Sequence, residues 1–408
     1  QPGKFGNYEC DASWELVKAS LQAAKDIDPM PDFIMWAGDN PPHAKNKSYL
    51  NVDRVLEITQ NITDLFTQMW PNTQVYATMG NHDYFPTSQL PAGPSQIYDK
   101  VGDMWAHWLD HTQGALESFK RGGSYVLQMK PGYKMIVYNT NIYYTRDLVT
   151  KNATDPGNQF QWLEQQLSAA RGAGEKVHIL THIPSGMMGS APGVHWFNEH
   201  HNRKFNEIIR NNGDIILGLY GVHQHTDTFH IFYKNDAAVA VQLIVPSVTP
   251  WKARITDTLR GDARNPGIRL FTYDKDTMQL LYYDQYYLDL PKQTGATPVW
   301  LRLYQSRGDY GLNDLSPSSM HNLVVNDFEK FASDKFHSYQ RWNTLNAVNN
   351  PCDARCKIAH ICSIKYVDYV DYDNCVKSYT SETAKIKTSL LLVGFFAVLS
   401  IKLHGHLL

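Results

Sequence analysis

Short runs of apolar residues punctuate the chain up to about Val245, and glycine or polar side chains follow each run closely. The runs are Phe33–Ala37, Val75–Met79, Met135–Tyr138, Val177–Leu180 and Asp214–Tyr220. Apolar runs of this length are typical of parallel strands that are buried on both faces of a sheet. We therefore predict a parallel sheet with polar residues at the carboxyl ends of its strands.

Between and beyond these runs the spacing of apolar residues changes. Helices with one buried face are predicted where apolar residues recur every three or four positions. The segments with this spacing are Ser13–Ile27, Val52–Trp70 and Phe160–Arg171. Later on, strands are predicted for Ile268–Tyr273 and Gln279–Tyr287, and helices for Ser318–Phe331 and Lys335–Leu345.

This order of elements predicts an α/β fold, with a two-sheet β-sandwich core flanked by helices. We expect three regions: a first domain over 1–290, a helical cysteine-rich subdomain over 291–380, and a hydrophobic tail over 381–408. Four of the five cysteines fall in the second region, as in a small disulfide-bonded module. They are Cys352, Cys356, Cys362 and Cys375.

The residues that follow the apolar runs include side chains that bind metals. Asp39 follows the first run and Asn81 the second, His182 follows the fourth, and His223 and His225 follow the fifth. Ligands of α/β sheets bind beyond the carboxyl ends of the strands. Two divalent ions held there, about 3.5–4 Å apart, would suit phosphoryl displacement. We therefore predict a metal site, and specifically a two-metal site.

The residue types favour particular roles within that site. The carboxylate of Asp39 can bridge two ions, Asn81 offers a neutral oxygen, and the imidazoles favour zinc or iron over magnesium. In an extended segment His223 and His225 point to the same side, so both can reach the cluster. His82 points elsewhere, where a general acid for the leaving oxygen could lie.

A single GD or NH pair is more simply interpreted as a turn, and a single histidine as a core or surface residue. The ordered set GD, GNHD, TH and HxH, each at a strand end, is much more specific. It resembles the calcineurin-like metallophosphoesterases. Longer stretches resemble the acid sphingomyelinase-like phosphodiesterases, most nearly their 3b type, from about Cys10 to about Cys375. These stretches are 36–43, 80–84, 139–141, 225–227 and 265–269.

The resemblance implies two zinc ions and assigns residues to them. Asp39 resembles the bridging ligand, and His225 resembles a ligand of one ion. The other ion's remaining ligands are matched by Asn81, His182 and His223. His82 and His43 resemble the two histidines that handle the leaving group or the transition state, while a metal-bound hydroxide attacks phosphorus.

Two departures from the family pattern stand out. The family has an Asp-x-His strand end before its first helix, which supplies two ligands to the ion that His225 binds, and no such motif precedes Asp39. In addition, Val222 replaces the usual glycine before the HxH motif, and a β-branched residue adopts positive φ only with strain. Either the sequence is incomplete at its N-terminus or its metal pair is impaired. Cys10 has no candidate partner outside the C-terminal group of cysteines. A partner in a missing upstream segment would explain it, which favours incompleteness; the other explanation is that Cys10 is a free buried thiol.

The composition and the ends of the chain set the expected location. A net charge of −2 argues against binding a nucleic acid polymer. Glycosylation sequons begin at Asn46, Asn61 and Asn152. The apolar segment Thr388–Ile401 is shorter than the ~20 residues of a spanning helix and follows a polar stretch. This arrangement resembles a glycosylphosphatidylinositol signal, with Ser381 as a guess for the attachment residue; the alternative is a marginal transmembrane anchor.

We therefore expect a monomeric phosphodiesterase, secreted or lipid-anchored at the outer face of the plasma membrane. Its expected substrates are phosphodiesters or pyrophosphates of nucleotides, or phospholipid headgroups. Two alternatives are a phosphomonoesterase and a catalytically impaired lipid- or receptor-binding module of the cell surface.

Overall fold

The computed structural model describes residues 3–43, 49–109, 114–252, 261–330, 332–348 and 352–379. The strands are β1 (Phe33–Trp36), β2 (Gln74–Ala77), β3 (Tyr125–Lys130), β4 (Tyr133–Tyr138), β5 (Lys176–Thr181), β6 (Ile216–Gly221), β7 (Thr228–Lys234), β8 (Ala237–Ile244), β9 (Gly267–Tyr273), β10 (Leu280–Leu288) and β11 (Trp300–Gln305). The α-helices are α1 (Trp14–Ile27), α2 (Val52–Met69), α3 (Gln96–Leu109), α4 (Ala115–Gly122), α5 (Gln159–Gly172), α6 (Glu199–Asn212), α7 (Ser306–Tyr310), α8 (Pro317–Leu323), α9 (Asp334–Trp342) and α10 (Ala354–Lys365).

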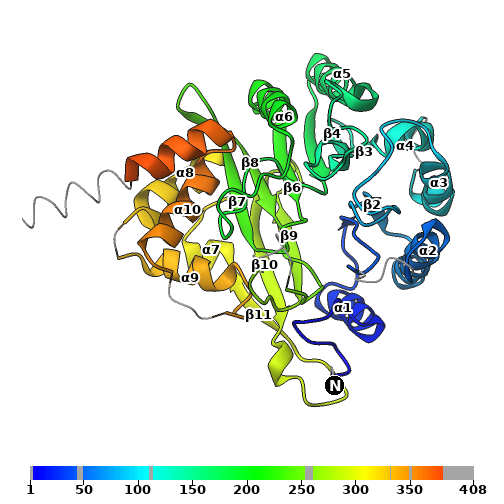
Figure 1. Ribbon diagram of the computed structural model, residues 1–408, viewed down its shortest axis with the longest axis horizontal. Helices are drawn as coiled ribbons and strands as arrows, with labels where there is room; N and C mark the ends of the chain where they lie inside the picture. The colour runs from blue at the N-terminus through cyan, green and yellow to red at the C-terminus, as the bar shows by residue number, and fades with distance from the viewer. Residues whose placement is uncertain are drawn as a thin grey trace, which may run out of the picture.

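The strands form a large sheet and two smaller ones (Figure 1). The large sheet has the order β3-β4-β5-β6-β8-β7, the second pairs β1 with β2, and the third has the order β11-β10-β9. All five predicted runs are strands, and β1–β2, β4–β5 and β5–β6 pair in parallel as expected. The sequence pattern therefore predicted the strands and their direction, and the α/β class with flanking helices is confirmed.

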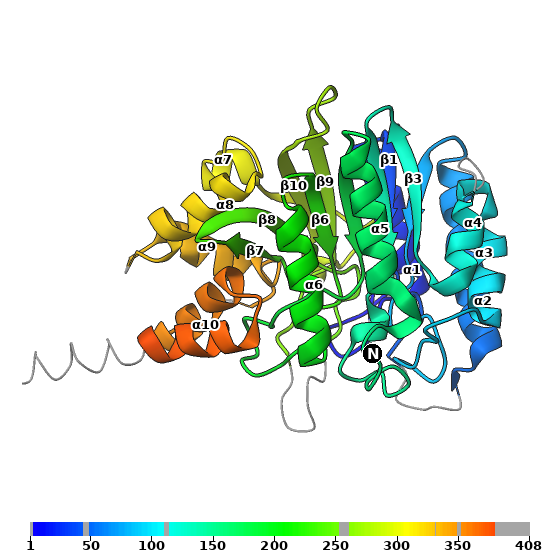
Figure 2. The ribbon, with the colours of Figure 1, turned by 90° about the horizontal axis from the view of Figure 1, so that it is seen from above.

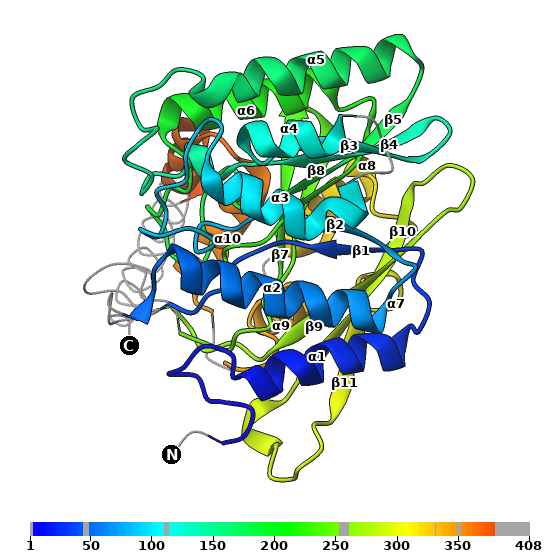
Figure 3. The ribbon, with the colours of Figure 1, turned by 90° about the vertical axis from the view of Figure 1, so that its right-hand side faces the viewer.

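Helices lie outside these sheets on both sides (Figures 2 and 3). α5 contacts β5, and α6 contacts β7 and β8. α1 and α2 run beside β1 in Figure 3. Both begin at polar caps, because the side chains of Ser13 and Asn51 accept hydrogen bonds from the backbone of Leu16 and Arg54. The predicted helices over these two segments and over 160–171 are confirmed within one or two residues.

A tyrosine joins β2 to the large sheet where no strand pairing does so. The Tyr125 hydroxyl accepts a hydrogen bond from the backbone N–H of Ala77 and donates one to its carbonyl, each at 2.9 Å. Tyr125 is fully buried. Its phenol therefore takes the part of a neighbouring strand at this position.

The C-terminal helices pack beside β7 and β8 and include two disulfides. Cys352 pairs with Cys356 and Cys362 with Cys375, which confirms the predicted disulfide-bonded module. The helix predicted from 318 ends earlier than expected and continues as a π-helix over Val324–Phe328. β11 follows the expected boundary at 290 and pairs with β10 across it; the boundary itself stays a prediction.

Cys10 is free and exposed, so the alternative of a buried thiol is wrong. Asn61 and Asn152 are exposed, as sequons require, whereas the sequon at Asn46 and the tail over 381–408 lie outside the described residues. Within the part of the chain that the structure describes, no helix has the length and apolarity needed to cross a membrane.

Folding stability should depend on pH through His178, which lies inside the large sheet. Its Nδ1 lies 3.0 Å from the Tyr220 hydroxyl, and its Nε2 lies 3.0 Å from the Met278 carbonyl. Both nitrogens are therefore satisfied when the ring is neutral, and burial lowers the pKa of His178 to about 4. The unfolded chain takes up this proton below its ordinary pKa of about 6.5.

The stability linked to His178 is thus fully present above pH ~6.5 and is lost as the pH falls towards the folded-state pKa. We expect the unfolding free energy to drop by about 2–3 kcal/mol more for the wild type than for His178→Gln between pH 7 and pH 4. Urea unfolding of both proteins measures this difference. Equal pH dependence of the two unfolding free energies would contradict the role given to His178. The other buried histidines are present in both proteins, so their contributions cancel in the comparison.

Candidate active site

Four of the predicted metal ligands meet beyond the carboxyl ends of parallel strands. Asp39 follows β1, Asn81 follows β2, His182 follows β5, and His223 follows β6. Ligand atoms of Asp39, His182 and His223 all lie within 4.8 Å of one another. The Asn81 Oδ1 oxygen lies 3.3 Å from Nε2 of His182. The structure therefore brings together the set that the sequence predicted for one ion.

A buried carboxylate that the sequence analysis left without a role holds the first two loops in place. Asp83 Oδ2 accepts hydrogen bonds from the backbone N–H groups of Asp39 (2.8 Å) and Gly80 (2.6 Å), and Oδ1 accepts one from Asn40 (2.9 Å). Burial raises the pKa of Asp83 to about 6, and the charge of Asp39 adds to this, although the three backbone bonds oppose it. The sequence did hold one signal for a role of Asp83, because it is the fourth residue of the GNHD motif.

Glycine is required where these two loops touch. A Cβ atom at Gly38, which has φ +84°, would lie 2.2 Å from the Gly80 nitrogen. A Cβ atom at Gly80 would lie 2.2 Å from Oδ1 of Asp39. Only the absence of both side chains lets the carboxylate of Asp39 turn into the site, with Asp39 itself at φ 59°.

The metal-free Asn139-Thr140-Asn141 segment ties the strand ends together. The Asn141 amide donates to the Met79 carbonyl at 2.7 Å, and the Thr140 hydroxyl accepts a hydrogen bond from the backbone of Ile183 at 3.0 Å. These bonds fix the loops that carry Asn81 and His182. In addition, the Asn81 amide nitrogen donates to Ser88 Oγ at 2.9 Å, which leaves its oxygen for the cluster.

His182 is held in one orientation by the backbone. Its Nδ1 lies 2.6 Å from the Ala37 carbonyl, so that nitrogen carries the proton and Nε2 faces Asp39 Oδ2 at 3.1 Å. Burial opposes the charge on both groups. Their attraction nevertheless raises the pKa of His182 above its ordinary value and holds the pKa of Asp39 well below its own.

The HxH segment is a turn and not the extended strand that we predicted. His223 and His225 both adopt left-handed backbone conformations, with φ of 62° and 60°. They therefore do not share one side: His223 reaches the cluster, whereas the ring of His225 lies 5.6 Å from that of His43. Val222 is not among the residues with positive φ, so the expected strain at this β-branched residue is absent.

Two histidines lie on the flank that His225 occupies. The rings of His43 and His82 are 4.1 Å apart, and the His82 backbone donates to Oδ1 of Asp39 at 2.8 Å. His43 Nδ1 lies 2.8 Å from Oδ1 of Asp11, and its ring stacks on Trp251 at 4.0 Å. The sequence analysis missed both Asp11 and Trp251, since neither belongs to a strand-end motif.

The donor set fits a metal ion on the side of His182. Buried imidazole nitrogens without a hydrogen-bond partner include Nδ1 of His223 and Nδ1 of His225. Burial lowers the pKa of both rings well below the ordinary value, so they are neutral and able to act as ligands. Within the described residues, no second group of three histidine, cysteine or acidic donors surrounds His225. One ion thus has a recognisable set, and the other has only Asp39 and His225.

Residues of the longer family-like stretches brace this site. Arg269 in β9 forms an ion pair with Asp227, with Nη2 2.5 Å from Oδ1, and both side chains are buried. Tyr304 in β11 donates its hydroxyl to the other Asp227 oxygen at 2.6 Å. The loop that carries His225 is thereby fastened to the three-stranded sheet.

Comparisons with known proteins agree with this geometry. Residues 9–227 match the calcineurin-like phosphoesterase family, and residues 237–382 match the acid sphingomyelin phosphodiesterase C-terminal region. The human acid sphingomyelinase-like phosphodiesterase 3b is 37% identical over 98% of this chain and 88% of its own length.

Two other relatives are similar over most of the chain. The bovine cyclic GMP-AMP phosphodiesterase SMPDL3A is 35% identical over 93% of this chain and 83% of its own length. The sphingomyelinase phosphodiesterase C of Dictyostelium discoideum is 33% identical over 91% and 83%. With these relatives and the ordered strand-end motifs, the chain belongs to the acid sphingomyelinase-like phosphodiesterases of the calcineurin-like metallophosphoesterase family.

Proposed function

We propose that this protein is a zinc-dependent phosphodiesterase that works at the outer face of the plasma membrane. The observation that carries the proposal is the convergence of Asp39, Asn81, His182 and His223 beyond four strand ends, next to the His43–His82 pair. A metal centre flanked by two imidazoles suits the cleavage of a phosphorus–oxygen bond. The two imidazoles among these ligands, His182 and His223, favour zinc over magnesium or calcium.

The chain's own residues would divide the work. When bound, the metal supplies a Lewis acid and a nucleophile at neutral pH. His82 and His43 protonate the leaving oxygen or stabilise charge on the phosphoryl oxygens. Asp11 orients His43 through its side-chain and backbone nitrogens, both at 2.8 Å. Asp83 keeps the backbone of Asp39 and Gly80 fixed while the substrate binds.

The proposed substrates are phosphodiester or pyrophosphate bonds of nucleotides, with phospholipid headgroups as a second class. The ring pair of His43 and Trp251 stacks at 4.0 Å beside the site, and an aromatic face of this kind can receive a base. The bovine relative is named for a cyclic dinucleotide diester, and the Dictyostelium relative is named for sphingomyelin, a phospholipid. These names support the diester class for this chain.

Turnover of a diester and a monoester with the same leaving group tests the proposal. We expect zinc-loaded protein to hydrolyse bis(p-nitrophenyl) phosphate faster than p-nitrophenyl phosphate, and a chelator to abolish both rates. A preference for the monoester would favour a phosphomonoesterase. Tight binding of lipid vesicles without hydrolysis of either compound would favour a lipid-binding module of the cell surface.

Attachment to the membrane is expected to occur through lipid. A processed signal would leave the chain ending near Ser381, because the apolar segment Thr388–Ile401 is shorter than a spanning helix. On cells that express the full gene product, phosphatidylinositol-specific phospholipase C should release the protein into the medium. Retention on the cells, with the tail peptide still detected by mass spectrometry, would indicate a transmembrane anchor instead.

A further inference from the structure

A second group of metal-binding donors lies in the C-terminal cysteine-rich module. The Sγ atoms of Cys352 and Cys356 and a ring nitrogen of His360 all lie within 4.8 Å of one another. Cys356 and His360 are one turn apart on α10, and Cys352 precedes this helix. In Figure 2, α10 and β1 lie on opposite sides of the molecule, so this group is separate from the cluster around Asp39.

In the structure the two sulfur atoms of this group are joined as a disulfide, which keeps them from acting as thiolate ligands. This bond joins cysteines with a sequence separation of 4, whereas Cys362 and Cys375 are 13 positions apart. A bridge that closes a shorter loop stabilises the fold less. Cys352 and Cys356 are also half-buried, whereas Cys362 and Cys375 are buried. A reducing dithiol should therefore open the Cys352–Cys356 bond first.

The start of α10 suits the thiols that reduction would produce. The Asp353 side chain caps the helix by accepting a hydrogen bond from the backbone N–H of Cys356 at 2.9 Å. Cys356 therefore lies in the first turn, where the backbone N–H groups and the helix dipole favour negative charge. A thiolate is stabilised at this position, and the thiolate is the form of cysteine that binds metals.

His360 is already prepared to act as a ligand. Its Nδ1 lies 3.2 Å from the Tyr339 hydroxyl, which lies 2.7 Å from Oγ1 of Thr228 at the start of β7. Outer contacts of this kind hold a metal-binding imidazole in one orientation. Burial lowers the pKa of His360 to about 4, so the ring is neutral at neutral pH. No proton has to leave the ring before a metal binds.

We propose that Cys352, Cys356 and His360 form a zinc site that opens and closes with the redox state of the two cysteines. Two thiolates and an imidazole select zinc over magnesium or calcium. Tetrahedral ligands at about 2.0–2.3 Å from zinc lie roughly 3.5–4 Å from one another, so the donors need only small movements to surround an ion. A water molecule would complete the set of four ligands.

The chemistry of this switch needs only a dithiol and the ion. The dithiol passes two electrons to the Cys352–Cys356 bond and becomes a disulfide itself, while the protein gains two thiols. Both thiols release their protons to the solvent as the two sulfur–zinc bonds form. In the reverse direction a disulfide reagent accepts the two electrons, the protein disulfide forms again and the ion leaves.

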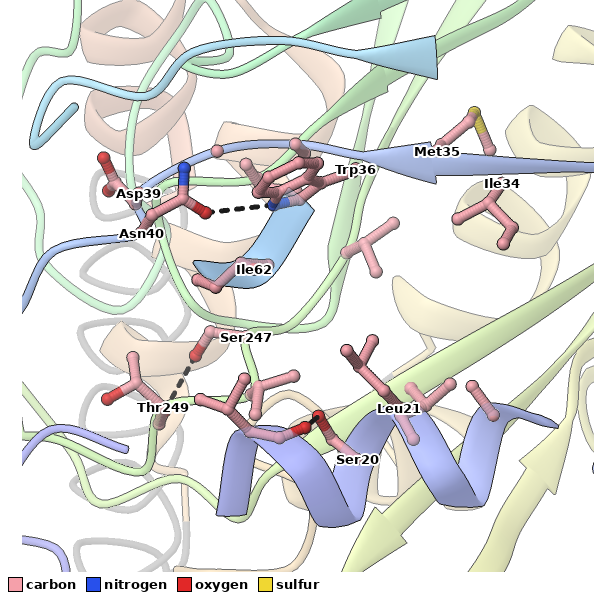
Figure 4. A pocket seen from close by; sticks show the side chains of 18 of the residues that line it. Ser20, Leu21, Ile34, Met35, Trp36, Asp39, Asn40, Ile62, Ser247 and Thr249 are labelled. Atoms are coloured by element: carbon pink, nitrogen blue, oxygen red, sulfur yellow. Dashed lines mark hydrogen bonds between the residues drawn. The ribbon is translucent and has the colours of Figure 1, made fainter. Parts of the chain in front are cut away.

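Cobalt gives a signal that distinguishes this site from the one at the strand ends. Co²⁺ bound by thiolates absorbs strongly in the near ultraviolet through sulfur-to-metal charge transfer, whereas oxygen and nitrogen ligands give no such band. Asp39 lies at a cavity of about 790 Å³ that β1 and β9 line, and no cysteine occurs among the described residues around it. The labelled side chain with a sulfur atom in Figure 4 is Met35, a thioether that cannot form a thiolate.

The measurement compares the 408-residue chain before and after reduction. The chain is treated with dithiothreitol, and the reagent is then removed in the absence of oxygen. We expect the reduced chain to bind a further Co²⁺ ion and to gain the charge-transfer band. Zinc should displace this ion and remove the band, and the oxidised chain should show neither effect.

Two variants and a control assign the band to these residues. Cys352→Ser combined with Cys356→Ser should bind no further cobalt after reduction. His360→Gln keeps the thiols and should weaken Co²⁺ binding by about 100-fold or more, since even the outer contacts of a ligand contribute roughly 10–100-fold. His337→Gln changes an exposed imidazole of α9 and should bind cobalt as the wild type does. If one of the two variants fails to fold, the other still tests the assignment.

Three results would overturn the proposal. The first is a reduced wild-type chain without the band. The second is a band that persists in the double cysteine variant, which would assign it to Cys362 and Cys375 or to Cys10. The third is an unchanged Co²⁺ affinity in His360→Gln, which would show that the thiols bind an adventitious ion only. Metal at the Asp39 cluster gives no such band, so each outcome is independent of the proposed phosphodiesterase activity.

Discussion

Asp39→Asn is expected to remove bound metal and to lower the rate of diester hydrolysis by roughly 10³-fold or more, since each 1.36 kcal/mol of lost stabilisation slows the reaction tenfold. Asp39 is the one carboxylate among the clustered donors that Asn81, His182 and His223 complete. Asparagine keeps the shape and loses the charge that attracts the cation. Metal analysis and bis(p-nitrophenyl) phosphate turnover on the same preparation measure both effects.

Asp32→Asn is the matched control for this substitution. Asp32 precedes the opposite end of β1 and accepts a hydrogen bond from Tyr273, which an asparagine oxygen can also accept. We expect this variant to retain metal and activity. The wild-type chain should hold one zinc ion tightly and a second weakly, because only Asp39 and His225 remain for the second ion. Two tightly bound ions would refute the view that ligands are missing, and unchanged metal in Asp39→Asn would refute the ligand role.

His82→Ala is expected to lower turnover by about 10²–10⁴-fold and to leave the zinc content unchanged. His82 contacts the cluster of candidate ligands through its backbone N–H, which donates to Asp39, while its ring faces His43. Truncation of the ring therefore removes a proton donor without removing a ligand. The comparison of turnover with zinc content separates the two roles.

His200→Ala provides a reference for the loss of an exposed imidazole, since His200 lies on α6 away from the cluster. It should leave turnover unchanged. Zinc lost from His82→Ala in parallel with activity would make His82 a ligand or a structural residue. A His82→Ala enzyme with normal turnover would leave protonation of the leaving oxygen to His43.

The strands, and the meeting of Asp39, Asn81, His182 and His223 beyond their ends, could be predicted from the sequence because both follow local rules. An apolar run that ends at Gly38-Asp39 or Gly80-Asn81 indicates both a buried strand and the turn that follows it. Parallel strands bring their carboxyl ends to one edge of a sheet. The position of His182 next to Asp39 follows from the same topology. Such features need no knowledge of how distant loops pack.

The other features depend on contacts that local patterns do not contain. The turn at His223 and His225 places two left-handed residues where a period of two would place an extended strand. Asp11 and Trp251 are 240 positions apart in the chain, yet both contact His43. The separation of β1 and β9 by a cavity is likewise a tertiary property, since each strand was predicted correctly without its neighbours.

The carboxylate of Asp83 has a consequence for how the metal would come and go. Because one side chain anchors backbone amides from two loops, those loops are already rigid before any cation arrives. Binding then costs little conformational entropy, and release leaves the shape of the site intact. Metal exchange in this protein should therefore require only that the metal–ligand bonds form and break at a preformed site. It should not require a folding transition of the kind seen in zinc fingers.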